Sequence, residues 1–159
     1  MYQVETKIKI DPNNNAKEVS KKLYLLAADK ILDIIDDILE NKVKFFEQDH
    51  SKATYAKKID KEEGKIVWSN EASKIIGKIN GLFPSPGAFF IFNGERYKIL
   101  KAKIGNGVGE PGEILSDYLE VACAFKKSVK VIEIQRQGKM AQKIGEFMLG
   151  SQLKKGHIV

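Results

Sequence analysis

The first 40 residues change from a hydrophobic period of two to a period of three to four. Over residues 2–10 apolar and polar side chains alternate, which predicts a half-buried strand. The sequence Asp-Pro-Asn-Asn-Asn at 11–15 interrupts that strand and offers helix caps. A helix is predicted from about Ala16 to Glu40 because apolar residues recur at helical spacing. Its apolar face consists of Val19, Leu23, Leu26, Ala27, Ile31, Ile34, Ile35 and Ile38.

One strand and one helix cannot bury their own apolar faces, so residues 1–47 are predicted to be the tail of a larger α/β domain. On their own they should be poorly anchored. We expect them to pack on the rest of the chain, to pair with a second copy, or to aggregate.

Residues 48–67 are rich in charge and are predicted to form a basic linker. Its few large apolar residues, such as Tyr55, would anchor it. Trp68 follows and is expected to pack in a core rather than to stack on a base. A short helix should come next, with Ser69 as N-cap and Gly81 ending it in a left-handed conformation. The apolar face of that helix would be Ile75, Ile76 and Ile79.

After residue 87 the hydrophobic period becomes two. Strands are predicted at 88–92, 96–104, 113–115, 118–124 and 129–135, with a hairpin turn at Asn93-Gly94. A helix near 141–149 closes the pattern. Closely spaced strands with glycine turns favour an α+β fold, an oligonucleotide/oligosaccharide-binding (OB)-like β-barrel over residues 68–159 with short helices. The strand and helix before it would be a remnant of a Rossmann-like domain.

Charge is distributed unevenly along the chain. The formal net charge is +6, from 27 Lys plus Arg against 21 Asp plus Glu. Residues 1–47 carry 8 basic and 9 acidic side chains, whereas residues 48–159 carry 19 basic and 12 acidic. A basic region favours a polyanionic partner, because each cation near a phosphate releases a condensed counterion. The same excess of positive charge is also expected for a basic surface that binds no partner.

The sequence contains few residues suited to catalysis or to metal binding. His50 and His157 have no second ligand at metal spacing, so no metal site is expected. Cys123 is the single cysteine and is expected to pack in a strand, as suits a reducing cytoplasm. No signal peptide and no membrane-spanning run is apparent in the sequence. No catalytic residue is therefore predicted.

The basic residues are the better functional candidates. Strict alternation would place Arg96 and Lys98 on one face of a strand and Lys101 and Lys103 on the other. Each cation alone fits a solvated surface position, but together they are predicted to line a phosphate groove. The residues predicted to bind the polyanion, which the resemblance described below implies to be tRNA, are Lys57, Lys58, Lys61, Arg96, Lys98, Lys101, Lys139, Lys154 and Lys155.

Several short motifs in their order resemble one enzyme family. They are Ile-Lys-Ile-Asp at 8–11, Thr-Tyr-Ala-Lys-Lys-Ile at 54–59, Ile-Val-Trp at 66–68, Phe-Pro-Ser-Pro-Gly-Ala-Phe at 83–89, Gly-Glu-Pro-Gly-Glu-Ile-Leu at 109–115, Gly-Lys-Met at 138–140, Phe-Met-Leu-Gly at 147–150 and Leu-Lys-Lys-Gly at 153–156. This arrangement resembles the C-terminal portion of the methionyl-tRNA formyltransferase family over nearly the whole chain.

The resemblance implies a function. Members of that family move a formyl group from 10-formyltetrahydrofolate to the amino group of methionine on initiator tRNA. Their catalytic Asn, His and Asp lie in an N-terminal domain, and no matching stretch is found here. The resemblance therefore implies that this chain binds initiator methionyl-tRNA, partners that catalytic domain, and neither binds the folate cofactor nor transfers formyl alone.

Two other interpretations remain open at the level of the sequence. The chain would be the C-terminal part of a sugar or other small-molecule formyltransferase, in which the barrel is structural. Alternatively it would be a free-standing, non-catalytic binding module. The basic region and the closely matched C-terminal motifs favour the tRNA enzyme.

Overall fold

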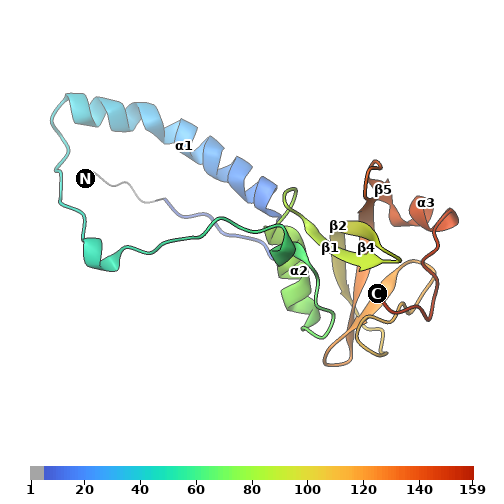
Figure 1. The fold of residues 1–159 in the computed structure, drawn as a ribbon. Coiled ribbons are helices and arrows are strands. Elements are labelled where there is room, and N and C mark those ends of the chain that lie inside the picture. The colour runs from blue at the N-terminus through green and yellow to red at the C-terminus, as the bar shows by residue number, and fades with distance from the viewer. Residues whose placement is uncertain (1–5) are drawn as a thin grey trace. The chain divides into compact units, whose positions relative to one another are not determined.

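The computed structural model describes residues 6–159 (Figure 1). The chain divides into two compact units, Met1–Lys58 and Ile59–Val159. The first unit contains helix α1 (Ala16–Leu39) and the short 3-10 helix η1 (His50–Lys52). The second unit contains every strand of the described chain, together with helices α2 and α3. The three-part division at residues 47 and 67 stays a prediction.

The long helix α1 begins as the sequence predicts. Asn15 is its N-cap: the Asn15 side chain accepts from the Glu18 N–H at 3.0 Å, and the Glu18 carboxylate accepts from the Asn15 N–H at 3.0 Å. This reciprocal pair satisfies two backbone donors that the first turn leaves free. The helix ends at Leu39, with Glu40 as C-cap.

The strand predicted at residues 2–10 is not present in the part that the structure describes. Residues 6–10 have no regular structure, and residues 2–5 lie outside the described residues. A strand needs a hydrogen-bonded neighbour, and the described residues of this unit provide none.

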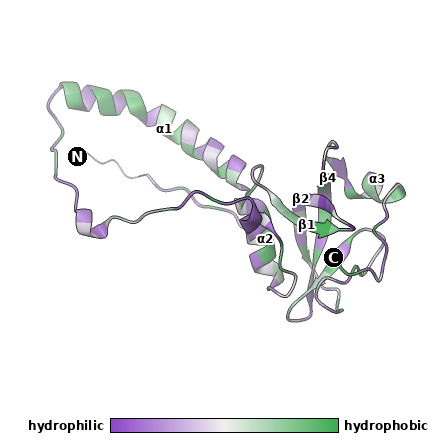
Figure 2. Cartoon of the chain, viewed as in Figure 1, coloured by the Kyte–Doolittle hydropathy of each residue, from purple (hydrophilic) through white to green (hydrophobic). Residues whose placement is uncertain are grey.

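No residue of helix α1 is buried in the part of the chain that the structure describes. Its apolar residues, coloured in Figure 2, include Leu23 at 44% exposure.

The second unit begins with the 3-10 helix η2 (Glu62–Gly64) and helix α2 (Ala72–Gly81). Two of the predicted end signals of α2 are wrong. Ser69 is not the N-cap, because residues 67–70 form a turn in which the Asn70 N–H donates to the Val67 carbonyl at 3.1 Å, and Glu71 takes the N-cap position. Gly81 is the last helical residue, and the following Leu82 has an ordinary φ of −95°.

The strands form one antiparallel sheet. They are β1 (Ala88–Phe92), β2 (Glu95–Gly105), β3 (Glu120–Cys123), β4 (Lys127–Arg136) and β5 (Gln142–Lys143), followed by α3 (Ile144–Leu149). The order along the sheet is β1-β2-β4-β3, and β5 also pairs with β4. The α+β class is confirmed; among the described residues the path of paired strands is open, with β1 and β3 at its ends.

Two predicted elements are shorter than expected, and one predicted turn is confirmed. Residues 113–115 form isolated bridges, Glu113 to Ile158 and Ile114 to Val121, rather than a strand. The last helix begins at Ile144, because residues 142 and 143 pair with β4. The β1–β2 hairpin turns at Asn93 and Gly94, whose φ values of 50° and 77° are those that the predicted Asn-Gly turn requires.

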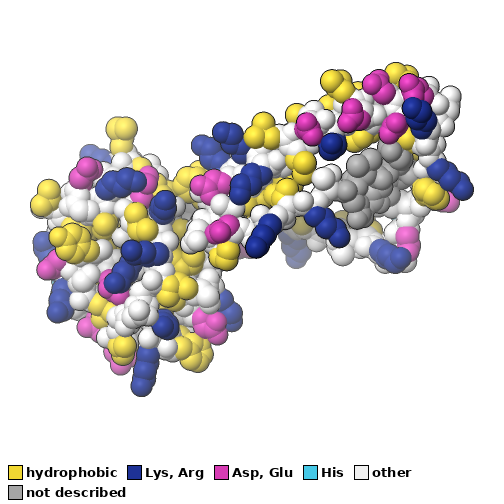
Figure 3. Space-filling view, turned by 180° about the vertical axis from the view of Figure 1, so that it is seen from behind, with side chains coloured by type: hydrophobic (Ala, Val, Ile, Leu, Met, Phe, Trp, Pro, Cys, Tyr) yellow, Lys and Arg dark blue, Asp and Glu magenta, His cyan; other side chains and the backbone are white. Residues whose placement is uncertain are grey.

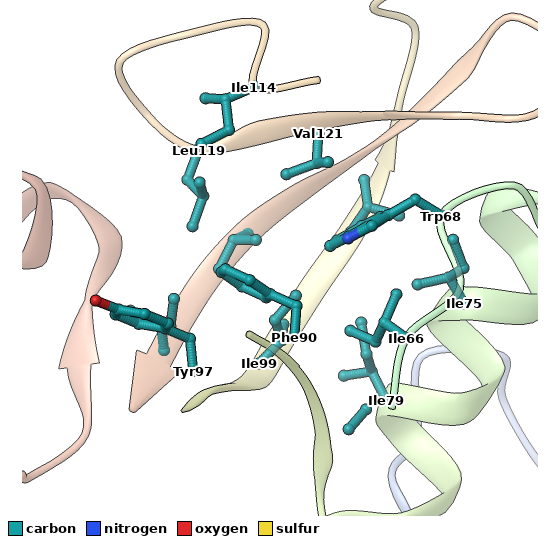
Figure 4. Packing of buried hydrophobic residues seen from close by; sticks show 14 of the residues in the cluster. Ile66, Trp68, Ile75, Ile79, Phe90, Tyr97, Ile99, Ile114, Leu119 and Val121 are labelled. Carbon is teal, nitrogen blue, oxygen red and sulfur yellow. The ribbon is translucent and has the colours of Figure 1, made fainter. Parts of the chain in front are cut away.

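The core lies between the inner side of the sheet and α2. Figure 4 shows Phe90 between Trp68 and Tyr97, and the ring centroids lie 6.0 Å and 5.3 Å from that of Phe90. Trp68 is therefore a core residue, as predicted. Cys123 is also buried, at 2% exposure, and burial raises the pKa of its thiol to about 11.

Candidate anion-binding face

The basic residues of β2 share one side of the sheet, contrary to the prediction from strict alternation. The register shifts between Ile99 and Ala102 and leaves Leu100 unpaired. Ile99 pairs with buried Ile134, and Ala102 pairs with buried Val131, so both face the core. A bulge of this kind adds one residue and reverses the alternation that follows it.

The consequence is a common outer side for four cations. Arg96 and Lys98 precede the bulge and lie opposite the inward-facing Tyr97 and Ile99. Lys101 and Lys103 follow the bulge and flank the inward-facing residue 102. The predicted separation of the two pairs onto opposite faces is therefore wrong.

An aromatic ring lies beneath Arg96 on this outer side. Phe89 is 1% exposed, and the Arg96 guanidinium carbon lies 3.5 Å from the centre of its ring. This contact is a cation–π interaction that also holds the guanidinium plane against the ring. The Arg96 Nε and Nη2 are both buried and have no hydrogen-bond partner within residues 6–159.

A cavity of about 310 Å³ opens beside this arginine. Two hydrogen bonds fix its rim: the Gln137 N–H donates to the Arg96 carbonyl at 2.9 Å, and the Gln135 side-chain amide donates to the Lys139 carbonyl at 2.9 Å. The residues that line it are Arg96, Lys98, Gln135, Arg136, Gln137 and Gly138. Three of the six are cationic.

Arg136, on the rim of the same cavity, is held by Glu95. Its Nη2 donates to one carboxylate oxygen of Glu95, and the Tyr97 hydroxyl donates to the other at 2.8 Å. The Arg136 hydrogen bond, followed by the one from Tyr97, holds the pKa of Glu95 below its usual range. The same pairing raises the pKa of Arg136. Arg136 is therefore oriented and partly neutralised, whereas Arg96 keeps its full charge.

The other predicted site residues are dispersed. Lys57 and Lys58 lie exposed on extended chain in the first unit, and Lys61 precedes η2 in the second. Lys139 is exposed on the turn after β4. Lys154 and Lys155 follow the fully buried Leu153 and are both exposed.

Sequence reasoning missed the polar lining contributed by β4. Gln135, Arg136 and Gln137 belong to the run Gln-Arg-Gln-Gly at the end of that strand. A polar run with an arginine where a strand ends is a usable signal, but only the register identifies its neighbours: Arg136 lies opposite Tyr97 and Gln135 opposite Lys98.

The basic surface is not one continuous stripe. In Figure 3, Lys and Arg side chains are interspersed with acidic and apolar ones. Some lysines are neutralised locally: Lys130 lies 3.4 Å from Glu120, and Lys143 lies 2.8 Å from Glu133. The outer side of β2 is thus distinguished by its unpaired cations more than by charge density.

The histidines have no chemistry in common. His50 is exposed in η1, and His157 stacks on Phe92 with ring centroids 5.2 Å apart. Within residues 6–159 no group of three or more His, Cys, Asp or Glu side chains could hold a metal ion. Over the same range no helix is both long and apolar enough to cross a membrane.

A family model described as "Formyl transferase, C-terminal domain" matches residues 58–152. That span includes the whole sheet, α2, α3 and the cavity beside Arg96. This chain belongs to the formyl transferase C-terminal domain family.

Two curated relatives of this formyl transferase C-terminal domain are named methionyl-tRNA formyltransferase. A methionyl-tRNA formyltransferase from Pelagibacter ubique is 58% identical over 150 residues, which covers 94% of this chain and 48% of the relative. One from Brucella anthropi is 35% identical over 153 residues, covering 94% of this chain and 50% of the relative. The resemblance to the C-terminal portion of these enzymes is confirmed. The chain spans about half the length of the relatives it matches.

Solved structures share the fold of this formyl transferase C-terminal domain. A variant of HypX from Aquifex aeolicus matches with a TM-score of 0.68 at 14% identity, over 90% of this chain and 27% of that one. HypX in complex with tetrahydrofolic acid matches with a TM-score of 0.61 at 16% identity, over 77% of this chain and 22% of that one. At these identities the likeness shows the fold alone.

Proposed function

We propose that this chain is the tRNA-binding portion of a methionyl-tRNA formyltransferase, an enzyme of translation initiation that works in the cytoplasm. The observation that carries the proposal is the outer side of β2, where Arg96 and Lys98 line the cavity and the bulge turns Lys101 and Lys103 to the same side of the sheet. Basic side chains on one side of a sheet suit a polyphosphate backbone, because each phosphate contact releases counterions. The relatives are named methionyl-tRNA formyltransferases, which supports tRNA as the proposed polyanion.

The chemistry belongs to the rest of the proposed enzyme. A formyl group passes from 10-formyltetrahydrofolate to the amino group of methionyl initiator tRNA. The catalytic residues and the folate site lie in the N-terminal half that the relatives have in addition. In support, one structural relative, HypX, binds tetrahydrofolic acid. We expect this chain alone to hold no folate and to catalyse no transfer, because the resemblance implies that the catalytic Asn, His and Asp lie in the other half.

The exposed stripe of α1 fits the same proposal. A cavity of about 370 Å³ runs along the apolar face of the helix, past Leu23, Leu26 and Ile31. An apolar face of this extent is stable only when another surface covers it. The N-terminal half of the enzyme is the proposed cover, and self-association through residues 1–47 takes its place when that half is absent.

The binding experiment is a fluorescence titration of the full chain with initiator and elongator tRNA across salt concentrations. Log K should fall against log salt by ~0.7 to 0.9 per phosphate neutralised, with little discrimination between tRNAs, because phosphate contacts carry no sequence information. The double variant Lys57→Ala, Lys58→Ala should bind all tRNAs more weakly and with a shallower slope. The matched control Lys17→Ala, Lys21→Ala removes the same charge from exposed positions on α1 and should change little.

A second double variant, Lys101→Ala with Lys103→Ala, tests the outer side of β2. It should lower the affinity and the slope in the same way. Wild type that binds no tRNA at low salt refutes the proposal and favours a small-molecule formyltransferase. If both double variants behave like the α1 control, these lysines are solvated surface charges only.

The catalytic part of the proposal has its own measurement. Purified chain, methionyl-tRNA and 10-formyltetrahydrofolate are mixed, and formyl-methionyl-tRNA is assayed. We expect no turnover with this chain alone. Product formation above the uncatalysed background contradicts the assignment of all catalytic groups to the other half.

A further inference from the structure

We propose that the cavity beside Arg96 is a built phosphate subsite, which holds one backbone phosphodiester of RNA with the Arg96 guanidinium as its planar donor. The inference rests on the proposed function and makes it specific. Arg96 would bind the phosphate in a fixed geometry, whereas the other cations of the outer side would attract RNA only through their charge. Arg96, Lys98 and Arg136 are the cations that line this cavity.

The guanidinium of Arg96 is already oriented. It lies 3.5 Å above the Phe89 ring, and that ring is fixed in turn, because the Phe89 carbonyl accepts the Ile66 N–H at 2.7 Å. An arginine held flat on a ring loses little further entropy when it binds an oxyanion. The orientation of this donor therefore exists before any ligand arrives.

The same guanidinium lacks hydrogen-bond partners. Nε and Nη2 are buried, and no acceptor within residues 6–159 reaches either nitrogen. A buried charged donor without a partner is costly, so such groups normally meet an acceptor or water. These two nitrogens form the edge of the guanidinium that binds an oxyanion through two parallel hydrogen bonds. A phosphate matches this edge in geometry and charge, and it reaches the two nitrogens once the atoms that cover them move aside, since neither nitrogen is exposed in this structure.

The surroundings of the cavity favour an anion. Lys98 lines it beside Arg96, and Arg136 lies on the far rim with its orientation fixed by Glu95. Glu95 contacts one cation of this set, Arg136, and its two carboxylate oxygens are occupied by Arg136 and the Tyr97 hydroxyl. The charge left uncompensated around the cavity is therefore positive.

The lining also distinguishes a phosphate from a nucleobase. The lining residues include no aromatic side chain. The Phe89 ring beneath Arg96 is 1% exposed and is covered by the arginine itself. A base would need an open ring face on which to stack, whereas a phosphate needs only donors and charge. The subsite thus positions RNA without reading its sequence.

The deciding variant keeps the charge and removes the planar donor. Arg96→Lys should lower tRNA affinity about tenfold or more, because a lysine cannot replace a stacked, bidentate guanidinium. Lys74→Arg is the matched control: it is the opposite exchange, at an exposed position on α2 of the same unit and outside the cavity, and should leave affinity within about twofold. Equal affinity of Arg96→Lys and wild type overturns the subsite while leaving the proposed function standing.

A second measurement uses the wild-type chain and therefore does not depend on whether a variant folds. The sequence contains two arginines, Arg96 and Arg136, so an ¹⁵N spectrum of the wild-type chain shows two Nε–H signals. Inorganic phosphate should shift the Arg96 signal saturably, whereas chloride at the same ionic strength should not. Absence of that shift overturns the subsite. If phosphate shifts the signal but wild type binds no tRNA, the subsite stands as an oxyanion site and the proposed function fails.

A third arm identifies the source of the phosphate. Transfer RNA whose 5′ phosphate has been removed should bind as tightly as untreated tRNA and should show the same loss in Arg96→Lys. If that loss disappears for dephosphorylated tRNA, the ligand is a terminal phosphate and the assignment to the backbone is overturned.

Discussion

Replacing Gly64 by alanine should destabilise the second unit, because the position has no room for a side chain. A Cβ built at Gly64 lies 2.4 Å from the Gly87 carbonyl oxygen and 3.3 Å from the Phe89 ring. The carbonyl cannot move easily, since the Gly87 N–H donates to the Leu82 carbonyl at 3.0 Å and its φ is +83°. The turn of η2 must therefore move away from β1.

The expected cost follows from that movement. Forcing a methyl group into a packed contact costs about 1–3 kcal/mol. Weakening the 2.7 Å hydrogen bond from the Ile66 N–H to the Phe89 carbonyl adds about 1 kcal/mol. For a unit of this size, 1 kcal/mol corresponds to about 4–8 °C in Tm, so a total cost of about 2–4 kcal/mol should lower the Tm of Gly64→Ala by roughly 8–30 °C.

The matched control is the same exchange at Gly77, in the exposed middle of α2. Nothing lies within 4 Å of a Cβ built there, so Gly77→Ala should gain up to about 1 kcal/mol of helix propensity. Trp68 is the single tryptophan and is 6% exposed, which makes its fluorescence during urea or thermal unfolding a specific probe of this unit. Equal stability of Gly64→Ala and wild type would show that η2 does not dock against β1 and would refute the reasoning.

Four further outcomes are expected. Phe90→Ala should cost about 3–5 kcal/mol in urea unfolding, whereas Phe125→Ala, 77% exposed, should cost less than about 0.5 kcal/mol. Asn15→Ala should lower the helix signal in far-UV circular dichroism, since losing an N-cap costs about 0.5–2 kcal/mol. Partial burial acts to raise the pKa of Glu120, but hydrogen bonds from a serine hydroxyl and a backbone N–H outweigh it and hold the pKa below 4.5. The free energy of unfolding should therefore fall as pH drops below 4.5, and it should fall less in Glu120→Gln. The Cys123 thiol, whose pKa burial raises to about 11, should react with a disulfide reagent slowly in the folded chain and fast in urea.

Features governed by local physics could be predicted from the sequence. A helix cap within residues 11–15 and the Asn93-Gly94 turn depend on neighbouring residues alone, and both are present as expected, with Asn15 as the N-cap. Trp68 and Cys123 are buried as predicted, because apolar side chains in a segment that forms a hydrophobic core are removed from water.

Other local signals were overridden by neighbouring chain. Ser69 is a good N-cap residue, yet the turn at 67–70 delays the helix to Ala72. The strand predicted at 2–10 has the right alternation, but residues 6–10 stay irregular in the absence of a paired neighbour in this structure. Alternation shows which residues suit a strand and does not supply the partner that a strand needs.

By itself, the sequence determined the family, the α+β class, the excess of positive charge after residue 47 and the tRNA-binding hypothesis, because motifs and composition are properties of the chain alone. Only the tertiary structure decided which cations lie on one side of the sheet. The register shift after Ile99 turns Lys101 and Lys103 to the side of Arg96, and the pairing of β2 with β4 brings Arg136 to the same cavity, 40 residues further along the chain. Both results depend on hydrogen bonds between distant strands, and these form only when the chain has folded.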